Sequence, residues 1–126
     1  MALNQDPDCE PVSLATLREL VLSYPGVTEG LSYGTPAFRV RANLLARLHD
    51  SGESLVLAID IGEREALMES DPVTFYLTDH YLRYPWILVR LSTVGRGELR
   101  ELFERAWRKA APKTLIAAYD RESTPQ

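Results

Sequence analysis

The chain has 126 residues, of which 45% are hydrophobic and 25% are charged, and this ordinary composition predicts one globular domain with its own core. Its apolar runs are too short to span a bilayer, and its start lacks the positive charge and apolar stretch of a secretory signal. The single cysteine, Cys9, has no disulfide partner within the chain, so we expect a cytoplasmic protein without a membrane partner.

The net charge of −4 at pH 7 is unevenly distributed along the chain. Residues 1–12 carry three acids and no base, whereas residues 13–119 carry thirteen of each and are neutral. Within this body, residues 53–79 hold seven acids and one base, and residues 90–113 hold seven bases and three acids. Such segregation fits either a positive face on an acidic protein or separate solvated surfaces.

The first part of the chain predicts a disordered lead-in followed by one helix. Residues 1–12 contain two prolines and few large apolar side chains, a composition typical of disorder. Ser13 is expected to cap a helix, because apolar side chains follow it at helical spacing: Leu14, Leu17, Leu20 and Val21. The helix is expected to end at residues 24–26, and a loop to run from there to Pro36.

The hydrophobic period then changes from that of a helix to that of a strand. Residues 37–41 and 44–49 alternate side chains around a turn at residues 42 and 43, which predicts a β-hairpin. One face is expected to carry Phe38, Val40, Leu44, Ala46 and Leu48, and the other Leu45, His49 and the arginines Arg39, Arg41 and Arg47. We therefore expect the hairpin to present the most basic surface of the protein.

The rest of the chain predicts three more strands and two more helices. Strands are expected at residues 55–60, 73–77 and 86–91, with a short helix at residues 63–70. A final helix ends at Pro112 and carries a wide apolar stripe made of Leu99, Leu102, Phe103, Ala106, Trp107 and Ala110. The order α-β-β-β-α-β-β-α predicts a two-layer α+β domain over residues 13–116, with a five-stranded antiparallel sheet and helices on one face. Residues 117–126 are expected to form a flexible tail.

No group of residues in the sequence has the spacing of a known catalytic or metal site. The two histidines are far apart, and the spacings typical of zinc ligands are missing. The acids at residues 63–71 fit an exposed helix face better than a cation site. We therefore expect no enzyme, no catalytic residue, no metal and no cofactor. Catalysis would require a deep pocket that gathers Tyr33, His80, Tyr84 and Arg90.

Residues 76–86 join two predicted strands and are rich in aromatic side chains. Aromatic faces and guanidinium groups are surfaces on which single-stranded bases stack. Aromatic side chains also fill the corners of small cores, and we expect this of Tyr76 and Trp86. Some of His80, Tyr81, Arg83 and Tyr84 are expected to face a functional surface.

The polar face of the final helix carries acids and bases that pair with each other. Glu101 and Glu104 each precede an arginine by four residues, which is the order that stabilises a helix. Arginines held in such pairs are less available to phosphates. Lys109 and Lys113 are then the uncommitted bases of this region, with Arg96 as a further candidate.

Two separated motifs make the sequence resemble the MmcQ/YjbR-like family. The first is LSYPGVTEG at residues 22–30 with SYGTPAFRV at residues 32–40, and the second is TDHY at residues 78–81 with YPWILVRL at residues 84–91. The resemblance extends to Trp107 and residues 111–113, and it implies a fold similar to secretion-chaperone-like and frataxin-like proteins. Members are commonly described as DNA-binding through a double wing of β-hairpins. The resemblance implies one wing at the basic hairpin and the other at the connection of residues 78–86.

Two hypotheses follow for the function. The first is a nucleic-acid-binding or regulatory module with DNA as its partner, acting through Arg39, Arg41, Arg47, His80, Arg83, Tyr84, Lys109 and Lys113. The second is a protein-interaction module, chaperone-like or self-associating, without DNA binding. It predicts an exposed apolar patch around Leu45 or Ile87.

Overall fold

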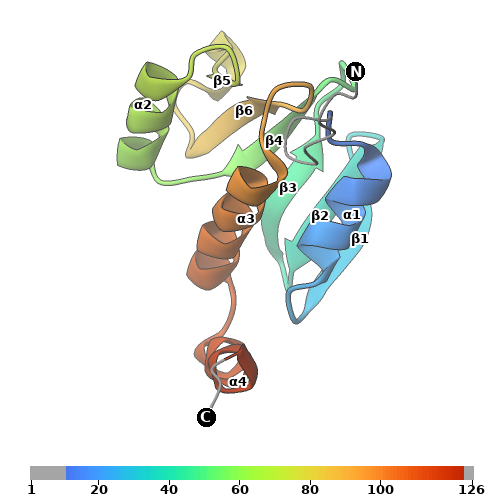
Figure 1. Ribbon diagram of the computed structural model, residues 1–126. Helices are drawn as coiled ribbons and strands as arrows, with labels where there is room; N and C mark the ends of the chain where they lie inside the picture. The colour runs from blue at the N-terminus through green and yellow to red at the C-terminus, as the bar shows by residue number, and fades with distance from the viewer. Residues whose placement is uncertain (1–10, 124–126) are drawn as a thin grey trace, which may run out of the picture.

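The computed structural model describes residues 11–123, which form a six-stranded antiparallel sheet with helices packed against it (Figure 1). The helices are α1 (Leu14–Leu22), α2 (Ile61–Ser70), α3 (Arg96–Ala110) and α4 (Lys113–Ser123). The strands are β1 (Val27–Ser32), β2 (Thr35–Val40), β3 (Asn43–Leu48), β4 (Ser54–Ala58), β5 (Phe75–Tyr76) and β6 (Trp86–Arg90). A short 3₁₀ helix, η2 (Asp79–Tyr81), lies between β5 and β6, and the strand order is β1-β2-β3-β4-β6-β5.

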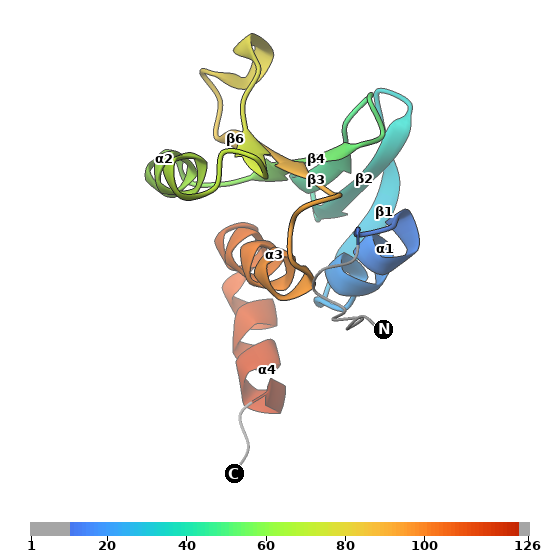
Figure 2. The ribbon, with the colours of Figure 1, turned by 45° about the horizontal axis from the view of Figure 1, so that its top comes forward.

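The sheet has two different faces. Helices α1 and α3 cover one of them, which we call the helix face, and the main core lies between these helices and the sheet (Figure 2). Helix α2 lies beside β5 and β6. The opposite face, which we call the open face, carries the connection between β5 and β6, residues 77–85. The expected α+β architecture with one antiparallel sheet is therefore confirmed.

The sheet has six strands where the sequence predicted five. The additional strand is β1, which pairs with β2 along its whole length in the segment that we expected to be a loop. Most side chains of β1 are exposed, so it has none of the apolar alternation that marks a half-buried strand. Its pairing with β2 and the tight turn that joins the two strands hold it in the sheet.

A β-bulge in β3 changes which side chains of the hairpin face the core. Ala46 pairs with β2 in the regular way, but the pairing then shifts so that Arg39 faces Leu44, and Leu45 is the extra residue. Leu45 and Ala46 both pack in the core, so the prediction that Leu45 lies on the basic face is wrong. Because a bulge interrupts the alternation of a strand, Leu44 and Arg47 lie on the open face.

Trp107 of α3 anchors the helices to the start of the sheet. It is fully buried, and its indole Nε1 donates a hydrogen bond of 2.9 Å to the backbone oxygen of Pro25. Its ring centroid lies 5.7 Å from that of Tyr24 and 5.0 Å from that of Tyr119. The Tyr24 hydroxyl donates to the carbonyl of Arg100, and burial raises the pKa of Tyr24 to about 12. This aromatic group joins the end of α1 to α3 and α4.

Gly26 allows the chain to turn closely beneath α4. Its φ is +77°, a left-handed conformation that glycine adopts without a steric penalty. A Cβ atom at this position would lie 2.8 Å from Cδ1 of Leu115, closer than two carbon atoms can pack. The Tyr-Pro-Gly sequence that was expected only to end a helix therefore also makes room for α4.

Helix α4 occupies much of the segment that we expected to be a flexible tail. Pro112 does end α3, but its carbonyl accepts the backbone N–H of Leu115, and a new helix begins at once. Leu115, Ile116 and Tyr119 stand at helical spacing and are partly buried against the core, and this packing stabilises the helix. Residues 124–126 of the predicted tail lie outside the described residues.

The predicted lead-in is only partly within the described residues. Residues 1–10 lie outside them. Val12 is buried, and its backbone N–H donates a hydrogen bond of 2.9 Å to the carbonyl of Leu91. The ordered chain therefore begins at least one residue before the expected boundary at Ser13.

We expect Trp107→Phe to lower the free energy of unfolding by about 2 kcal/mol or more, because it leaves the Pro25 carbonyl unpaired and opens a cavity in the core. Urea denaturation would measure the change. Trp86→Phe, at a half-buried tryptophan of the open face, is the matched control and should lose less. Equal losses in the two variants would contradict the anchoring role of Trp107.

We expect the packing of α4 to weaken in acid. Arg108 donates hydrogen bonds of 2.7 and 3.2 Å to the carboxylate of Asp120 and thereby lowers the pKa of Asp120. A carboxyl group with a lowered pKa stabilises the native state above its ordinary pKa, and this stabilisation is lost as the pH falls through the lowered value. Amide chemical shifts of residues 113–123 should therefore change below about pH 4. Asp120→Asn should remove this transition, and its persistence would count against the Arg108 contact as the cause.

Candidate functional site

A small second core lies on the open face beneath the β5–β6 connection. Val56 and Leu88 of the sheet pack against Tyr81 of η2, and Tyr76 and Trp86 pack around them. The expectation that Tyr76 and Trp86 fill a corner of the core is therefore confirmed. This cluster holds the connection against the sheet and places its polar residues beside the strands.

Arg64 of α2 fixes the course of this connection. It is 4% exposed, and its guanidinium donates to three backbone oxygens: Tyr84 at 2.7 Å, Leu82 at 3.2 Å and Trp86 at 3.3 Å. The Nε atom is buried without a hydrogen-bond partner among the described residues, and the carboxylate of Glu65 lies 3.9 Å from it. The buried charge is thus balanced mainly by carbonyl dipoles, which makes the connection and α2 dependent on each other.

A pocket of about 350 Å³ opens on this face between the β1–β2 turn and the connection. This volume is at the lower end of the range for small-molecule sites. Most of its lining residues carry rings, and the others are two apolar strand residues, one arginine and one serine. The ring-bearing residues are Tyr33, His80, Tyr81, Tyr84 and Trp86, and the others are Leu44, Val56, Arg47 and Ser32. The pocket joins the two segments that the family resemblance pointed to.

Tyr33 stands at the rim of this pocket on a two-residue turn. Tyr33 and Gly34 both have positive φ, 53° and 80°, as a type I′ hairpin turn requires. Glycine adopts this conformation readily, whereas a tyrosine rarely does. The Tyr33 side chain is 88% exposed, and its ring centroid lies 5.3 Å from the guanidinium carbon of Arg47. An exposed ring in a strained conformation beside a pocket is a candidate binding residue.

Arg47 is buried beneath the rings. Its Nη2 donates a hydrogen bond of 2.6 Å to the Tyr81 hydroxyl. Its Nη1 has three long contacts, at 3.3 Å to the Thr35 hydroxyl, 3.3 Å to the Leu48 carbonyl and 3.4 Å to Asp50. Arg47 is therefore part of the floor of the pocket and not the exposed phosphate contact that we predicted.

His80 and Tyr84 reach the pocket from the connection, as does the ring of Tyr81. The His80 and Tyr81 rings meet edge to face, with centroids 4.7 Å apart. Tyr84 is 56% exposed, and Arg83 beside it is also exposed. The sequence prediction that this connection presents a ring-bearing surface is consistent with these positions.

The other arginines of the hairpin do not form one exposed row. Arg39 is half-buried on the open face opposite Leu44. Arg41 is exposed in the turn between β2 and β3, with a φ of 55°, at the end of β2 away from Tyr33. The bulge in β3 and the burial of Arg47 thus divide the basic surface that the sequence pattern predicted.

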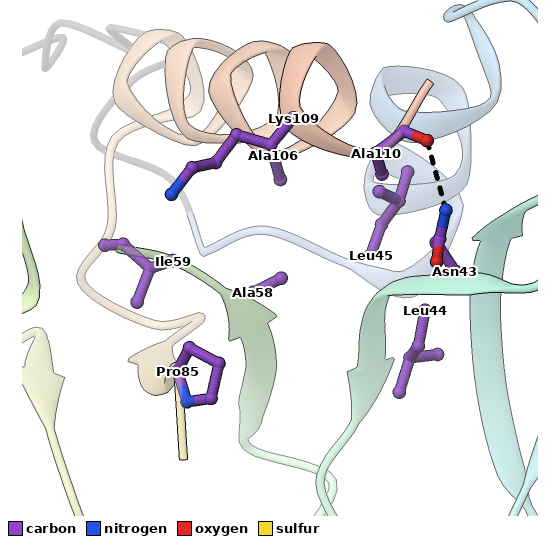
Figure 3. A pocket seen from close by; sticks show the side chains of 9 residues that line it. All are labelled: Asn43, Leu44, Leu45, Ala58, Ile59, Pro85, Ala106, Lys109 and Ala110. Atoms are coloured by element: carbon purple, nitrogen blue, oxygen red, sulfur yellow. Dashed lines mark hydrogen bonds between the residues drawn. The ribbon is translucent and has the colours of Figure 1, made fainter. Parts of the chain in front are cut away.

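The two lysines of the prediction lie on other parts of the molecule. Lys109 of α3 borders a second pocket of about 260 Å³, between α3 and the ends of β3 and β4, where the Asn43 amide donates to the Ala110 carbonyl (Figure 3). Its Nζ lies 3.6 Å from the carboxylate of Asp60, so it is not an uncommitted base. Lys113 is exposed at the start of α4.

The ion pairs of α3 differ in part from those expected. Arg108 does bind Glu104, at 3.0 Å, as the spacing predicted. Arg105 instead binds Glu63 of α2 at 2.8 Å and not Glu101. Arg105 and Arg108 of this helix are therefore committed to α2, α3 and α4. Arg96 and Arg100, also on α3, take part in no ion pair among the described residues.

The group of four residues that we required for catalysis is only partly assembled. Tyr33, His80 and Tyr84 share the pocket, but Arg90 lies elsewhere, where it donates to the Val73 carbonyl at 2.9 Å and covers the ring of Tyr76. Across residues 11–123, no cluster of three or more histidine, cysteine or acidic side chains could hold a metal ion. Within the same range, no helix is both long enough and apolar enough to cross a bilayer.

Neither residue of the predicted apolar patch is exposed. Leu45 and Ile87 are both buried in the core, so the surface feature that the protein-interaction hypothesis required is not at these positions. The bulge explains the burial of Leu45, and Ile87 is buried because its side chain packs in the main core.

Fold and site together define a small α+β domain with a ring-lined pocket on the open face of its sheet. The sequence matches the family model of YjbR over residues 22–109, and the chain belongs to the YjbR family. It is similar to Uncharacterized protein Rv2570 of Mycobacterium tuberculosis and Uncharacterized protein Mb2600 of Mycobacterium bovis, each 38% identical over 60 residues. These matches cover 48% of this chain and 46% of each relative, so the chain spans about half the length of these relatives.

A solved structure shares the fold. The crystal structure of Deinococcus radiodurans protein DR2400, which has a DUF419 domain, superposes with a TM-score of 0.67 and 22% identity. The superposition covers 82% of this chain and 80% of that one. The likeness extends over most of the domain and concerns its fold.

Sequence reasoning missed two residues that shape the site. Arg64 was counted only as the single base of an acidic stretch, and its burial could not be read from that pattern. Tyr33 was named only as part of a catalytic group. A tyrosine followed by glycine between two short segments is a signal for a two-residue turn, and it could have placed Tyr33 at a hairpin tip.

We expect Arg64→Ala to lower the free energy of unfolding by about 1.5–3 kcal/mol, because three carbonyls lose a charged donor. Hydrogen exchange should rise most in residues 77–86. Arg105→Ala, which breaks an exposed pair to the same helix α2, is the matched control and should cost about 0–1 kcal/mol. Unchanged exchange in the connection of the Arg64 variant would contradict the role assigned to Arg64.

Proposed function

We propose that the protein binds single-stranded nucleic acid on the open face of its sheet. The observation that carries this proposal is the pocket that gathers Tyr33, His80 and Tyr84, with the first 88% and the last 56% exposed. Stacking of a base on an aromatic side chain contributes about 1–3 kcal/mol, and every base has a face that can stack. The exposed rings would thus supply most of the binding free energy and little sequence preference.

Two arginines near the pocket would supply phosphate contacts. Arg39 lies on the same face of the sheet as Leu44, and Arg83 adjoins Tyr84 in the connection. Among the described residues neither of them takes part in an ion pair. Few phosphate contacts imply a modest salt dependence, with log K falling by about 0.7 per contact for each unit of log salt.

The arrangement favours a single strand over a duplex. Duplex binding draws chiefly on cations spread along the phosphate backbone. Here Arg47 is buried, Lys109 is paired, and Arg41 lies at the far end of the hairpin, so the cations do not line two wings. Exposed rings beside a pocket instead suit bases that are free to leave a stack.

A protein partner has less support than a nucleic acid. With Leu45 and Ile87 buried, the remaining apolar candidates are exposed side chains on different elements, among them Leu31 on the edge strand β1, Ile61 at the start of α2 and Leu82 in the connection. Isolated apolar side chains are common on protein surfaces. The proposed activity is binding without catalysis, at a cytoplasmic location.

We expect Tyr33→Ala and Tyr84→Ala each to weaken the binding of a fluorescent single strand by about fivefold to hundredfold, since each removes a stacking surface. Tyr33→Phe keeps the ring and should bind nearly as the natural protein does. Fluorescence anisotropy at low salt, with a duplex of the same sequence in parallel, would measure these affinities. The duplex should bind more weakly.

Two results would count against this proposal. One is the lack of any binding to single strands at tens of micromolar protein and low salt. The other is a loss in Tyr33→Phe as large as that in Tyr33→Ala, which would assign the effect to the hydroxyl group and not to stacking.

A further inference from the structure

We infer that the pocket takes a nucleotide that ends in a phosphate monoester, with the phosphate bound by Arg47. This inference rests on the proposed function and specifies which part of a strand enters the pocket. A free mononucleotide and the phosphorylated end of a strand carry the same chemistry, and the experiment below separates them.

The first reason is that the charge of Arg47 is buried and poorly compensated. Its side chain is 9% exposed, and the nearest carboxylate, that of Asp50, lies 3.4 Å away on a side chain that is 72% exposed. A carboxylate in water is a weak partner for a buried cation, and burying a cation without a strong partner is costly. An anion that enters the pocket would remove this cost.

The second reason is the hydrogen bonding of the guanidinium. Nη2 has one short bond, to the Tyr81 hydroxyl at 2.6 Å, which fixes the orientation of the planar group. The three contacts of Nη1, to Thr35, Leu48 and Asp50, are all 3.3 Å or longer, near the limit for a hydrogen bond. A phosphate oxygen could replace them with a short, charge-assisted bond, and a guanidinium matches phosphate better than an ammonium does.

The third reason is the combination of size and lining. An internal phosphate of a strand carries a nucleoside on both sides, whereas a terminal one carries a single nucleoside and suits a pocket of about 350 Å³. Rings of Tyr33, Tyr84 and Trp86 line the same pocket and offer surfaces to one base. The arginine at the floor and the rings around it fit one nucleotide, bound with its phosphate directed into the pocket and its base against the rings.

The test compares ligands that differ only in the phosphate. Fluorescent oligothymidylate with a 5′-phosphate, with a 3′-phosphate or with neither would be titrated by anisotropy, and thymidine monophosphate and thymidine would compete. We expect either the 5′-phosphate or the 3′-phosphate to tighten binding at least tenfold relative to the strand with neither. We also expect the monophosphate to compete and thymidine to compete at least tenfold less well.

A pair of variants tests the residue. Arg47→Lys keeps the charge but loses the planar guanidinium with its paired N–H donors. The difference in affinity between phosphorylated and unphosphorylated strands should therefore shrink to about twofold or less. Arg90→Lys is the matched control, because Arg90 lies outside the pocket and its change should keep the difference intact. Thermal melting would verify that each variant folds, and if Arg47→Lys does not fold, the ligand comparison on the natural protein decides.

The outcomes separate this inference from the proposed function. Strands that bind equally well with and without a terminal phosphate would overturn the inference and leave strand binding in place. Binding of the monophosphate without binding of any strand would support the inference and overturn the strand proposal. Binding of neither would overturn both.

Discussion

The hydrogen bond between the Trp107 indole and the Pro25 carbonyl is the contact on which the arrangement of the domain depends. It joins the last turn of α3 to the point where the chain leaves α1 and enters the sheet. The rings of Tyr24 and Tyr119 contact the Trp107 ring and each other, so three helices meet at one buried aromatic cluster. The helix face of the sheet is therefore buried in the main core, and the candidate site lies on the open face.

Arg64 does for the open face what Trp107 does for the helix face. Both are buried side chains whose polar atoms bind backbone carbonyls distant in sequence. Because a carbonyl accepts without regard to the side chain of its residue, Arg64 sets the path of residues 82–86 without contacting their side chains through these bonds. The identities of Arg83 and Tyr84 can therefore serve a ligand and need not serve the fold.

The regular elements could be predicted from the sequence because their apolar residues repeat with a clear period. The stripe of α3 and the apolar run of β6 are examples, and both elements lie where the pattern placed them. Strand β1 could not be found in this way, since its pairing with β2 depends on backbone hydrogen bonds and not on buried side chains. The one-residue shift in pairing caused by the bulge at Leu45 could not be found by counting alternating residues either.

The candidate site was predictable in its parts but not in its assembly. Aromatic residues of the connection and arginines of the hairpin were recognised by type, yet burial decides what each can do. The sequence predicted Arg47 as an exposed cation, but in the structure it lies in the floor of the pocket, because Tyr81 of the connection covers it and accepts its hydrogen bond. No property of the sequence around Arg47 predicts a contact with a tyrosine thirty-four positions away. Contacts of that range are set by the whole fold.

The hairpin tip formed by Tyr33 and Gly34 has a consequence for how such a domain can diversify. The tip borders the pocket, yet its exposed ring lies outside both hydrophobic clusters. A substitution of Tyr33 thus changes the side chain that a ligand contacts at the rim of the pocket without removing a side chain from the core. Ligand preference can therefore change through single substitutions at this position. Relatives with this architecture can acquire different preferences through one solvent-facing position, and the same position is a natural point for redesign.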